Sequence, residues 1–407
     1  MEARLIPTPA ESGQARESFY DPFMAEVFDG DPYPLYRRLR DESPRLFLPR
    51  YNAWFFSRFE DVWQLSKEPS LSVAQGLTTS QLLLCTPAHP LMVSQMDPPQ
   101  HTMFRSLLNE IFKPAAASAL EAAIRRRAVE LLEPIRARGG GDMMADFGSP
   151  LAAEVGCILS GLPAADVALQ IAWNRNFFDR APGHRGDTET GARAFVELMQ
   201  YIVDRVDAAR RGTEHAAGTL KLLLDAQKND STVTDAHIVN MVFNMQIAAG
   251  DTVPKGIAAT LYRLWEAPEQ RDLLEAEPGL AHAAYMEGTR LDMPTQMQGR
   301  AATTRLELGD TQIEPGHKTM LLFASASRDD REFPEPEAFR IDRDPRRTLV
   351  FGNGIHRCLG VHVAQVEGTV AIQEVMARLP LFRIDPAASL QCKTEFLKGW
   401  ASLCLSL

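Results

Sequence analysis

The chain has 407 residues, 45% of them hydrophobic and 24% charged, and this ordinary globular composition excludes a disordered or fibrous protein. With 43 Lys and Arg against 53 Asp and Glu, the formal net charge is −10, which disfavours general nucleic-acid binding. The five scattered cysteines contain no CxxC pair, and no segment is apolar enough for a signal peptide or a membrane span, so we expect a soluble, cytoplasmic protein without a disulfide framework or a zinc site.

The predicted elements of the first two thirds of the chain are mostly helices. Residues 53–56, AWFF, are a short aromatic run typical of a strand. After this run, apolar residues recur at three- and four-residue spacing, which is typical of amphipathic helices. Thr232 and Thr234 are candidate caps for the N-terminus of the last such helix. The helices predicted from this spacing span residues 120–132, 192–211 and 236–265.

The later part of the chain carries strand and turn signals. Residues 306–320 predict a β-hairpin, with turn residues at 309–310 and 315–316. The segments 382–384 and 401–407 predict a terminal β-ribbon.

Taken together, these elements predict a mainly α fold of the α+β type with small peripheral sheets. No change in composition marks a domain boundary. We therefore expect a single domain over residues 1–407, in which about residues 1–18 form a flexible tail.

The segment with the clearest chemistry is 351–360, FGNGIHRCLG. Its three glycines allow tight turns and a close approach to a flat, bulky group. Cys358 precedes the predicted helix 361–379, so the helix dipole and the loop N–H groups favour a thiolate, and His356 and Arg357 add positive charge. Such a thiolate can be a nucleophile or an axial iron ligand, whereas an inert buried cysteine would not need the glycines.

This segment resembles the haem-binding loop of the cytochromes P450, Phe-Gly/Ser-x-Gly-x-His/Arg-x-Cys-x-Gly, and matches it at every fixed position. The resemblance implies the single-domain helical fold of that family, with haem b as cofactor and Cys358 as the metal ligand on the proximal side of the iron. It also implies that Phe351, Gly352, His356 and Gly360 contact the haem.

A Glu-x-x-Arg pair, which the same family contains, occurs upstream at Glu287 and Arg290. The spacing places both side chains on one helix face, and the resemblance makes them a structural ion pair. The family often completes this network with an Arg or His where this chain has Ala338. We therefore expect Arg340 or another residue to compensate, or the network to be smaller.

The proline turn 97–99 opens a predicted helix on which His101 and Arg105 share one face. Two cationic donors in this arrangement suit a pair of carboxylates. The resemblance implies that His101 and Arg105, together with Arg300 and His356, hold the haem propionates, which are otherwise costly to bury.

An acid beside a hydroxyl, Asp251 and Thr252, lies within the long predicted helix, where these residues are poor helix formers. Local inconsistency of this kind is typical of functional sites. The resemblance makes Asp251 and Thr252 the catalytic pair that directs protons to dioxygen, and it places Ala248 against the haem. Pro254 leaves the Gly250 carbonyl without its helical partner, so we predict a local widening of the helix that opens a groove for dioxygen and water.

The segments that face the haem in this family are mostly apolar here, which predicts a hydrophobic small organic substrate. Each of these residues, taken alone, is more often core than pocket. Arg175 and Arg180 are candidates to hold a substrate carboxylate. The predicted substrate pocket consists of Leu83, Met92, Met245, Ala248, Met293, Met297 and Phe396.

The sequence contains neither a flavin or ferredoxin extension nor iron–sulfur cysteine spacing, so electrons are expected from a separate ferredoxin and its reductase. An acidic ferredoxin would dock on basic residues of the proximal face. The residues predicted for this dock are Arg105, Lys113, Arg346, Arg347 and Arg357.

The sequence thus predicts a soluble bacterial haem-thiolate monooxygenase that inserts one oxygen atom of dioxygen into a hydrophobic molecule. A peroxide-driven haem peroxygenase and a non-catalytic haem-binding sensor are the two alternatives. The Asp251 and Thr252 pair favours dioxygen activation with proton delivery over both.

Overall fold

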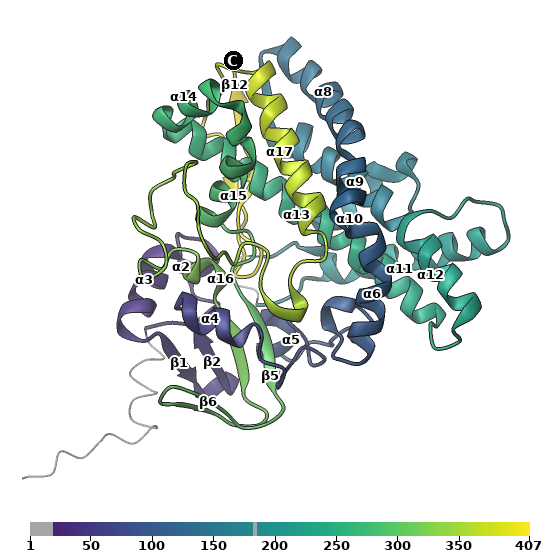
Figure 1. Ribbon diagram of the computed structural model, residues 1–407, viewed down its shortest axis with the longest axis vertical. Helices are drawn as coiled ribbons and strands as arrows, with labels where there is room; N and C mark the ends of the chain where they lie inside the picture. The colour runs from purple at the N-terminus through teal and green to yellow at the C-terminus, as the bar shows by residue number, and fades with distance from the viewer. Residues whose placement is uncertain (1–18, 182–184) are drawn as a thin grey trace, which may run out of the picture.

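The computed structural model describes residues 19–181 and 185–407, in which helices form the larger part and small sheets lie at the periphery (Figure 1). The predicted mainly α fold is therefore confirmed, whereas the predicted tail of residues 1–18 lies outside the described residues. The helices are α2 (Ala25–Phe28), α3 (Tyr33–Glu42), α4 (Phe59–Leu65), α5 (Thr79–Leu83), α6 (Gln100–Phe112), α7 (Pro114–Ala119), α8 (Glu121–Arg138), α9 (Ser149–Ser160), α10 (Val167–Phe177), α11 (Glu189–Arg210), α12 (Gly218–Asn229), α13 (Asp235–Glu266), α14 (Pro268–Ala276), α15 (Ala281–Leu291), α16 (Phe323–Ala326) and α17 (Val361–Arg378), with a π-helical segment η3 (Met143–Gly148). The strands are β1 (Arg45–Leu48), β2 (Ala53–Phe56), β3 (Leu71–Ser72), β4 (Gly140–Asp142), β5 (Gln298–Ala302), β6 (Leu306–Leu308), β7 (Thr311–Ile313), β8 (Lys318–Leu321), β9 (Arg383–Ile384), β10 (Leu390–Gln391), β11 (Trp400–Ser402) and β12 (Cys404–Ser406).

Helix α13 runs through the helical part and packs against α9, α15 and α17 (Figure 1). Its N-terminus is capped by Thr234, whose hydroxyl oxygen accepts the N–H of His237, while the His237 ring accepts the N–H of Thr234 at 3.2 Å. The other candidate cap, Thr232, instead donates to Asp230 at 2.7 Å. The predicted helix boundaries 236–265 are therefore correct to within one residue.

The predicted widening of this helix at Pro254 is wrong. Helix α13 is α-helical without interruption from Asp235 to Glu266, and the π-helical geometry occurs in the neighbouring segment η3. Pro254 packs on Gly148 of η3, where an added Cβ would lie 3.2 Å from the Cβ of Pro254. Close packing around the proline keeps the turn α-helical despite the missing N–H.

The largest sheet has the strand order β1-β2-β8-β5-β3. Strand β2 coincides with the predicted strand 53–56; it pairs antiparallel with β1 and parallel with β8. Strands β6 and β7 form the predicted hairpin around Gly309 at φ 60°. Strand β8 does not belong to that hairpin, because its buried residues Met320 and Leu321 pack in the core of the large sheet.

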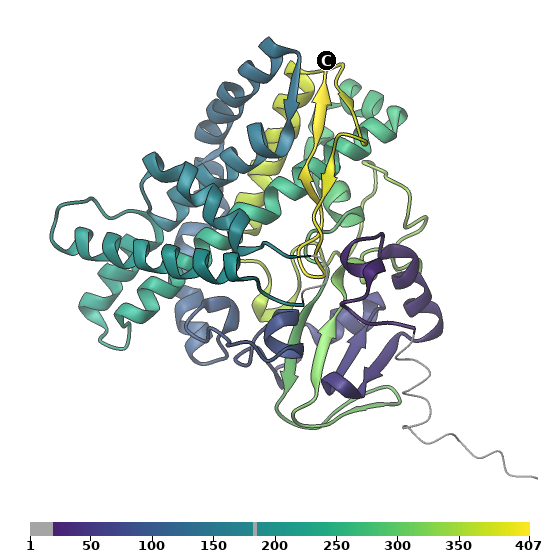
Figure 2. The same ribbon diagram turned by 180° about the vertical axis from the view of Figure 1, so that it is seen from behind.

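The predicted terminal ribbon is formed by β9 and β12, which pair antiparallel. Strand β12 also pairs with β4, and β11 pairs with β10 rather than extending the ribbon. Figure 2 shows these C-terminal strands, drawn in yellow, beside the helical part.

Two hydrophobic cores are present in the described part of the chain. The core on the sheet side draws its residues from 20–83 and 293–349. The helical core draws its residues from 92–291 and 339–405. Residues 92–291, which form most of the helical core, are thus inserted between the two chain segments that build the large sheet. In the described ranges, no helix has the length and apolarity that a membrane span needs.

Candidate active site

The loop 351–360 is shaped by two of its three glycines. Gly352 and Gly354 have φ values of 68° and 76°, which favour glycine, whereas Gly360 has φ −82° and needs no glycine for its backbone. The N–H of Cys358 donates to the carbonyl of Phe351 at 2.8 Å and closes the loop. This closure places the cysteine directly before α17.

The side chain of Cys358 is accessible, although it lies deep among protein atoms. This enclosure raises the pKa of the thiol, while the N–H of Gly360 and the charges of Arg105 and Arg357 act in the opposite direction. A sulfur that is accessible and faced by donors and positive charge suits a thiolate ligand of a metal ion.

Two arginines and two histidines meet beside this loop. His101 and Arg105 come from α6, and Arg300 comes from β5. The rings of His101 and His356 lie 4.5 Å apart between centroids, and Arg105 Nη2 donates to the Arg357 carbonyl at 2.6 Å. The structure therefore brings together the four residues predicted to hold a pair of carboxylates.

Burial and mutual repulsion disfavour positive charge in this cluster. Burial lowers the pKa of His356 to about 3, and the positive charges of Arg300, His101 and Arg105 contribute to the shift. Burial likewise lowers the pKa of Arg300 to about 10, against the opposing effect of Asp97. Two carboxylates placed here would relieve both perturbations.

Two buried donors support the same conclusion. His101 Nε2 is buried without a hydrogen-bond partner among the described residues. Arg300 is 4% exposed and donates to the carbonyl of Gly299 at 2.8 Å; within 19–181 and 185–407 it forms no ion pair, and Asp97 acts on it only through its charge. Buried guanidinium groups without a counter-charge are costly, so the residues present fit the two propionates of a haem.

The acid–alcohol pair lies in the middle of α13. Ala248 is exposed although its helix is largely buried. The hydroxyl of Thr252 donates to the Ala248 carbonyl at 3.3 Å, a long hydrogen bond. The carboxylate of Asp251 pairs with Lys255, a functional candidate that the sequence reasoning missed; an acid four residues before a lysine was the available signal.

The predicted ion pair of Glu287 and Arg290 is buried and doubly hydrogen-bonded, at 2.7 and 2.8 Å. Arg343 completes the network, with its Nε 3.0 Å from Glu287 Oε1. The backbone N–H of Arg340 donates to the same oxygen at 3.2 Å, and the Ala338 carbonyl accepts from Arg343 at 3.2 Å. The network is therefore not reduced by the alanine.

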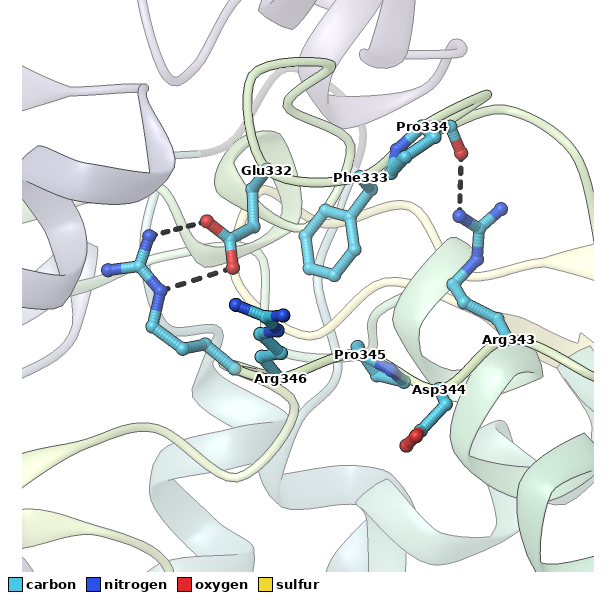
Figure 3. Close-up of a pocket in the computed structure, with 8 residues that line it drawn as sticks. Glu332, Phe333, Pro334, Arg343, Asp344, Pro345 and Arg346 are labelled. Carbon is cyan, nitrogen blue, oxygen red and sulfur yellow. Dashed lines mark hydrogen bonds and ion pairs between the residues drawn. The ribbon is translucent and has the colours of Figure 1, made fainter.

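A surface pocket lies next to this network (Figure 3). Arg343 donates to the carbonyl of Pro334 at 2.6 Å on one side, and Arg347 pairs with Glu332 at 2.5 Å and with Glu60 at 2.7 Å on the other. The pocket is lined by Glu332, Phe333, Pro334, Arg343, Asp344, Pro345, Arg346 and Arg347.

These contacts reduce the set of basic residues available for docking. Arg347 is occupied by its two acidic partners, and Lys113 pairs with Glu110 at 2.7 Å. Arg346 and Arg357 are exposed.

The predicted substrate-pocket residues are distributed over both cores. Leu83, Met293 and Met297 belong to the sheet-side core, and Met92 and Met245 belong to the helical core. The sulfur of Met293 accepts a hydrogen bond from Ser327 at 3.3 Å, so this side chain faces the Arg290 network. Phe396 is buried, at 6% exposure.

The two arginines considered as carboxylate anchors differ in their surroundings. Arg180 pairs with Asp187 at 3.1 Å, and Arg175 is exposed.

Comparisons with known proteins agree with this site. A family model described as Cytochrome P450 matches residues 280–394. The chain is 33% identical over 366 residues to Cytochrome P450 130 of Mycobacterium tuberculosis, covering 87% of this chain and 89% of that protein. It is 32% identical over 365 residues to Vitamin D(3) 25-hydroxylase of Pseudonocardia autotrophica, with the same coverage of 87% and 89%.

Among solved structures, CalO2 superposes with a TM-score of 0.84 at 28% identity, covering 95% of this chain and 98% of that one. A relative above 30% identity over most of both chains establishes common descent. The chain therefore belongs to the cytochrome P450 family, and it is a monooxygenase whose cofactor is haem b.

Proposed function

We propose that this protein uses dioxygen and electrons from a separate ferredoxin to insert one oxygen atom into a hydrophobic small organic molecule. The observation that carries the proposal is the cluster of two arginines and two histidines, Arg105, Arg300, His101 and His356, which lies beside the accessible sulfur of Cys358. We also propose that the chain is one domain, because the site combines residues as far apart in the sequence as His101 and Cys358.

Cys358 binds the haem iron as a thiolate, and His101, Arg105, Arg300 and His356 hold the two propionates. When bound, the haem supplies the redox chemistry that activates dioxygen. Binding of the propionates would lower the free-energy cost of burying the two arginines, because the carboxylates would supply the negative charge that these guanidinium groups lack as ion-pair partners.

Asp251 and Thr252 deliver protons to the reaction. The long hydrogen bond of the Thr252 hydroxyl to Ala248 leaves that hydroxyl free to turn toward a water or a substrate. The side chain of Asp251 is 17% exposed, so its carboxylate exchanges protons with solvent at the edge of the helix.

Ferredoxin docks where basic residues remain free near Cys358. Arg346 and Arg357 are exposed and are available to an acidic partner, whereas Arg347 and Lys113 are already paired. Charge reversal at Arg346 is therefore expected to slow reduction more than charge reversal at Lys113, with an effect that decreases at high salt.

The carbon-monoxide difference spectrum of the reduced protein tests the iron ligand. A Soret band at the thiolate position is expected for the wild type, and its loss is expected in Cys358→Ala. The variant Arg300→Leu is expected to keep the band position but to retain less haem after gel filtration. A wild-type band at the imidazole position would refute Cys358 as the ligand.

Turnover separates the proposed function from its alternatives. The test compounds are vitamin D(3), testosterone and myristic acid, which are named for a related enzyme and for two ligand-bound P450 structures. Spin-state shifts identify those that bind, and oxidation is then measured with ferredoxin and reductase or with hydrogen peroxide alone. Product from peroxide alone indicates a peroxygenase, and binding without product under both conditions indicates a sensor.

A further inference from the structure

A buried lysine lies one turn beyond the proposed proton-delivery pair. The side chain of Lys255 is 3% exposed, and its ammonium donates to the Asp251 carboxylate and to the carbonyl of Leu397 at 3.0 Å. Burial alone would lower the pKa of Lys255, but Asp251 and Cys392 outweigh that effect and raise it. The lysine is therefore charged. It is the only salt-bridge partner of Asp251 within the parts of the chain that the structure describes.

The segment that receives Lys255 is itself held in place. The Phe396 carbonyl accepts the N–H of Gln296 at 2.9 Å, and the N–H of Lys398 donates to the Pro294 carbonyl at 2.9 Å. These two hydrogen bonds flank Leu397 and fix the position of its carbonyl. The anchor point of the lysine is therefore a rigid part of the fold.

Gly399 leaves room for the lysine stem. An added Cβ at this position would lie 3.0 Å from the Cγ of Lys255, and the φ of Gly399 is +143°, which few other residues adopt. The absence of a side chain at Gly399 thus leaves space for the Lys255 side chain to extend from α13 to the segment 396–399.

We propose that Lys255 is a positioning residue that holds the Asp251 carboxylate in the orientation needed for proton delivery by anchoring it to the backbone of residues 396–399. This inference rests on the proposed role of Asp251. An ion pair at the edge of the site fixes where the carboxylate lies, because the lysine has a second, rigid partner in Leu397.

The test compares Lys255→Gln, Lys255→Arg and a control that also removes a buried lysine, Lys398→Gln. Lys398 is 7% exposed and donates to the carbonyl of Val27 at 3.3 Å, and it forms no ion pair with Asp251. Each holoprotein is reduced by a plant-type ferredoxin and its reductase. The readouts are NADPH oxidation, the share of electrons released as hydrogen peroxide, and the solvent deuterium isotope effect; haem content and the carbon-monoxide spectrum verify folding.

Lys255→Gln is expected to keep the haem, to lower the rate about tenfold, and to raise both the peroxide share and the isotope effect, because the carboxylate is no longer held. Lys255→Arg is expected to restore most of the rate, since it keeps the charge. Lys398→Gln is expected to match the wild type in peroxide share and isotope effect. A double-mutant cycle of Lys255→Gln and Asp251→Asn on the unfolding midpoint is expected to be non-additive, independently of turnover.

Two outcomes separate the two proposals. If Asp251→Asn has the wild-type rate and isotope effect, the proton-delivery role of Asp251 is wrong, whatever Lys255 does. If Asp251→Asn is impaired while Lys255→Gln has wild-type rate, peroxide share and isotope effect, Lys255 is only structural and this inference is overturned.

Discussion

Glu367 on α17 allows a quantitative prediction of pH-dependent stability. Its side chain is 2% exposed, its Oε1 has no hydrogen-bond partner in the described residues, and burial raises its pKa from 4.5 to about 8. The folded protein therefore holds a proton that the unfolded chain releases. At about 1.4 kcal/mol for each pKa unit, this difference corresponds to at most about 5 kcal/mol of folding free energy.

The sign follows from which state ionises first. Below about pH 4.5 the carboxyl group is protonated in both states, so it does not contribute to the pH dependence. As the pH rises from about 4.5 to about 8, ionisation stabilises the unfolded chain alone, and the free energy of unfolding falls. Glu367→Gln removes the ionisation, so its stability relative to the wild type should increase across this range and level off above it.

The difference in the free energy of unfolding between the wild type and Glu367→Gln is measured by urea unfolding of the haem-loaded proteins across this pH range. Unfolding is followed by tryptophan fluorescence and circular dichroism. Glu374 provides a matched control on the same helix, because its carboxylate is paired with Arg125 at 2.7 Å and Arg378 at 3.0 Å. Glu374→Gln should destabilise the protein at neutral pH. If the stability of Glu367→Gln stays parallel to that of the wild type throughout, Glu367 ionises normally and the reasoning is refuted.

Three further variants test the packing around the site. Arg343→Gln removes one charged partner of Glu287 and should lower the free energy of unfolding by about 1.5–3 kcal/mol in urea titrations. A change near zero would show that the ion pair of Arg343 and Glu287 does not contribute to stability. Thr234→Ala removes the cap of α13 and should cost about 1 kcal/mol in the same assay, with Thr234→Ser as the variant that restores stability. Gly288→Ala brings a Cβ within 2.7 Å of the Cα of Thr260 and should reduce the yield of haem-loaded protein; a normal yield and melting temperature would contradict this close approach.

Local sequence patterns predicted those parts of the site that depend on short-range geometry. The loop around Cys358 and the adjacent cationic residues of α6 lie as predicted, because glycine turns and helix faces are set by neighbours in sequence. Arg343 was not predicted as the partner of Glu287, since that contact depends on how a long irregular segment folds back on α15. Lys255 was missed because its burial depends on the remote segment 396–399.

The same distinction explains the errors in the fold. The hairpin of β6 and β7 follows from its turn and was predicted, but the pairing of β8 with β2 is a long-range contact that no local pattern contains. The widening at Pro254 was inferred from the proline alone. The geometry of α13 at Pro254 depends on the packing of η3 against this turn of the helix, which the sequence around Pro254 does not contain.

The pairing of β2 with β8 has a consequence for how the protein is made. During synthesis the β1–β2 hairpin leaves the ribosome early, with Phe55 and Phe56 ready to be buried, yet Lys318–Leu321 must be translated before the neighbouring strand exists. Residues 92–291, which form most of the helical core, emerge in between. For most of translation this hairpin is an unfinished sheet with an open apolar edge, which is prone to aggregation and is a segment that a nascent-chain chaperone would protect.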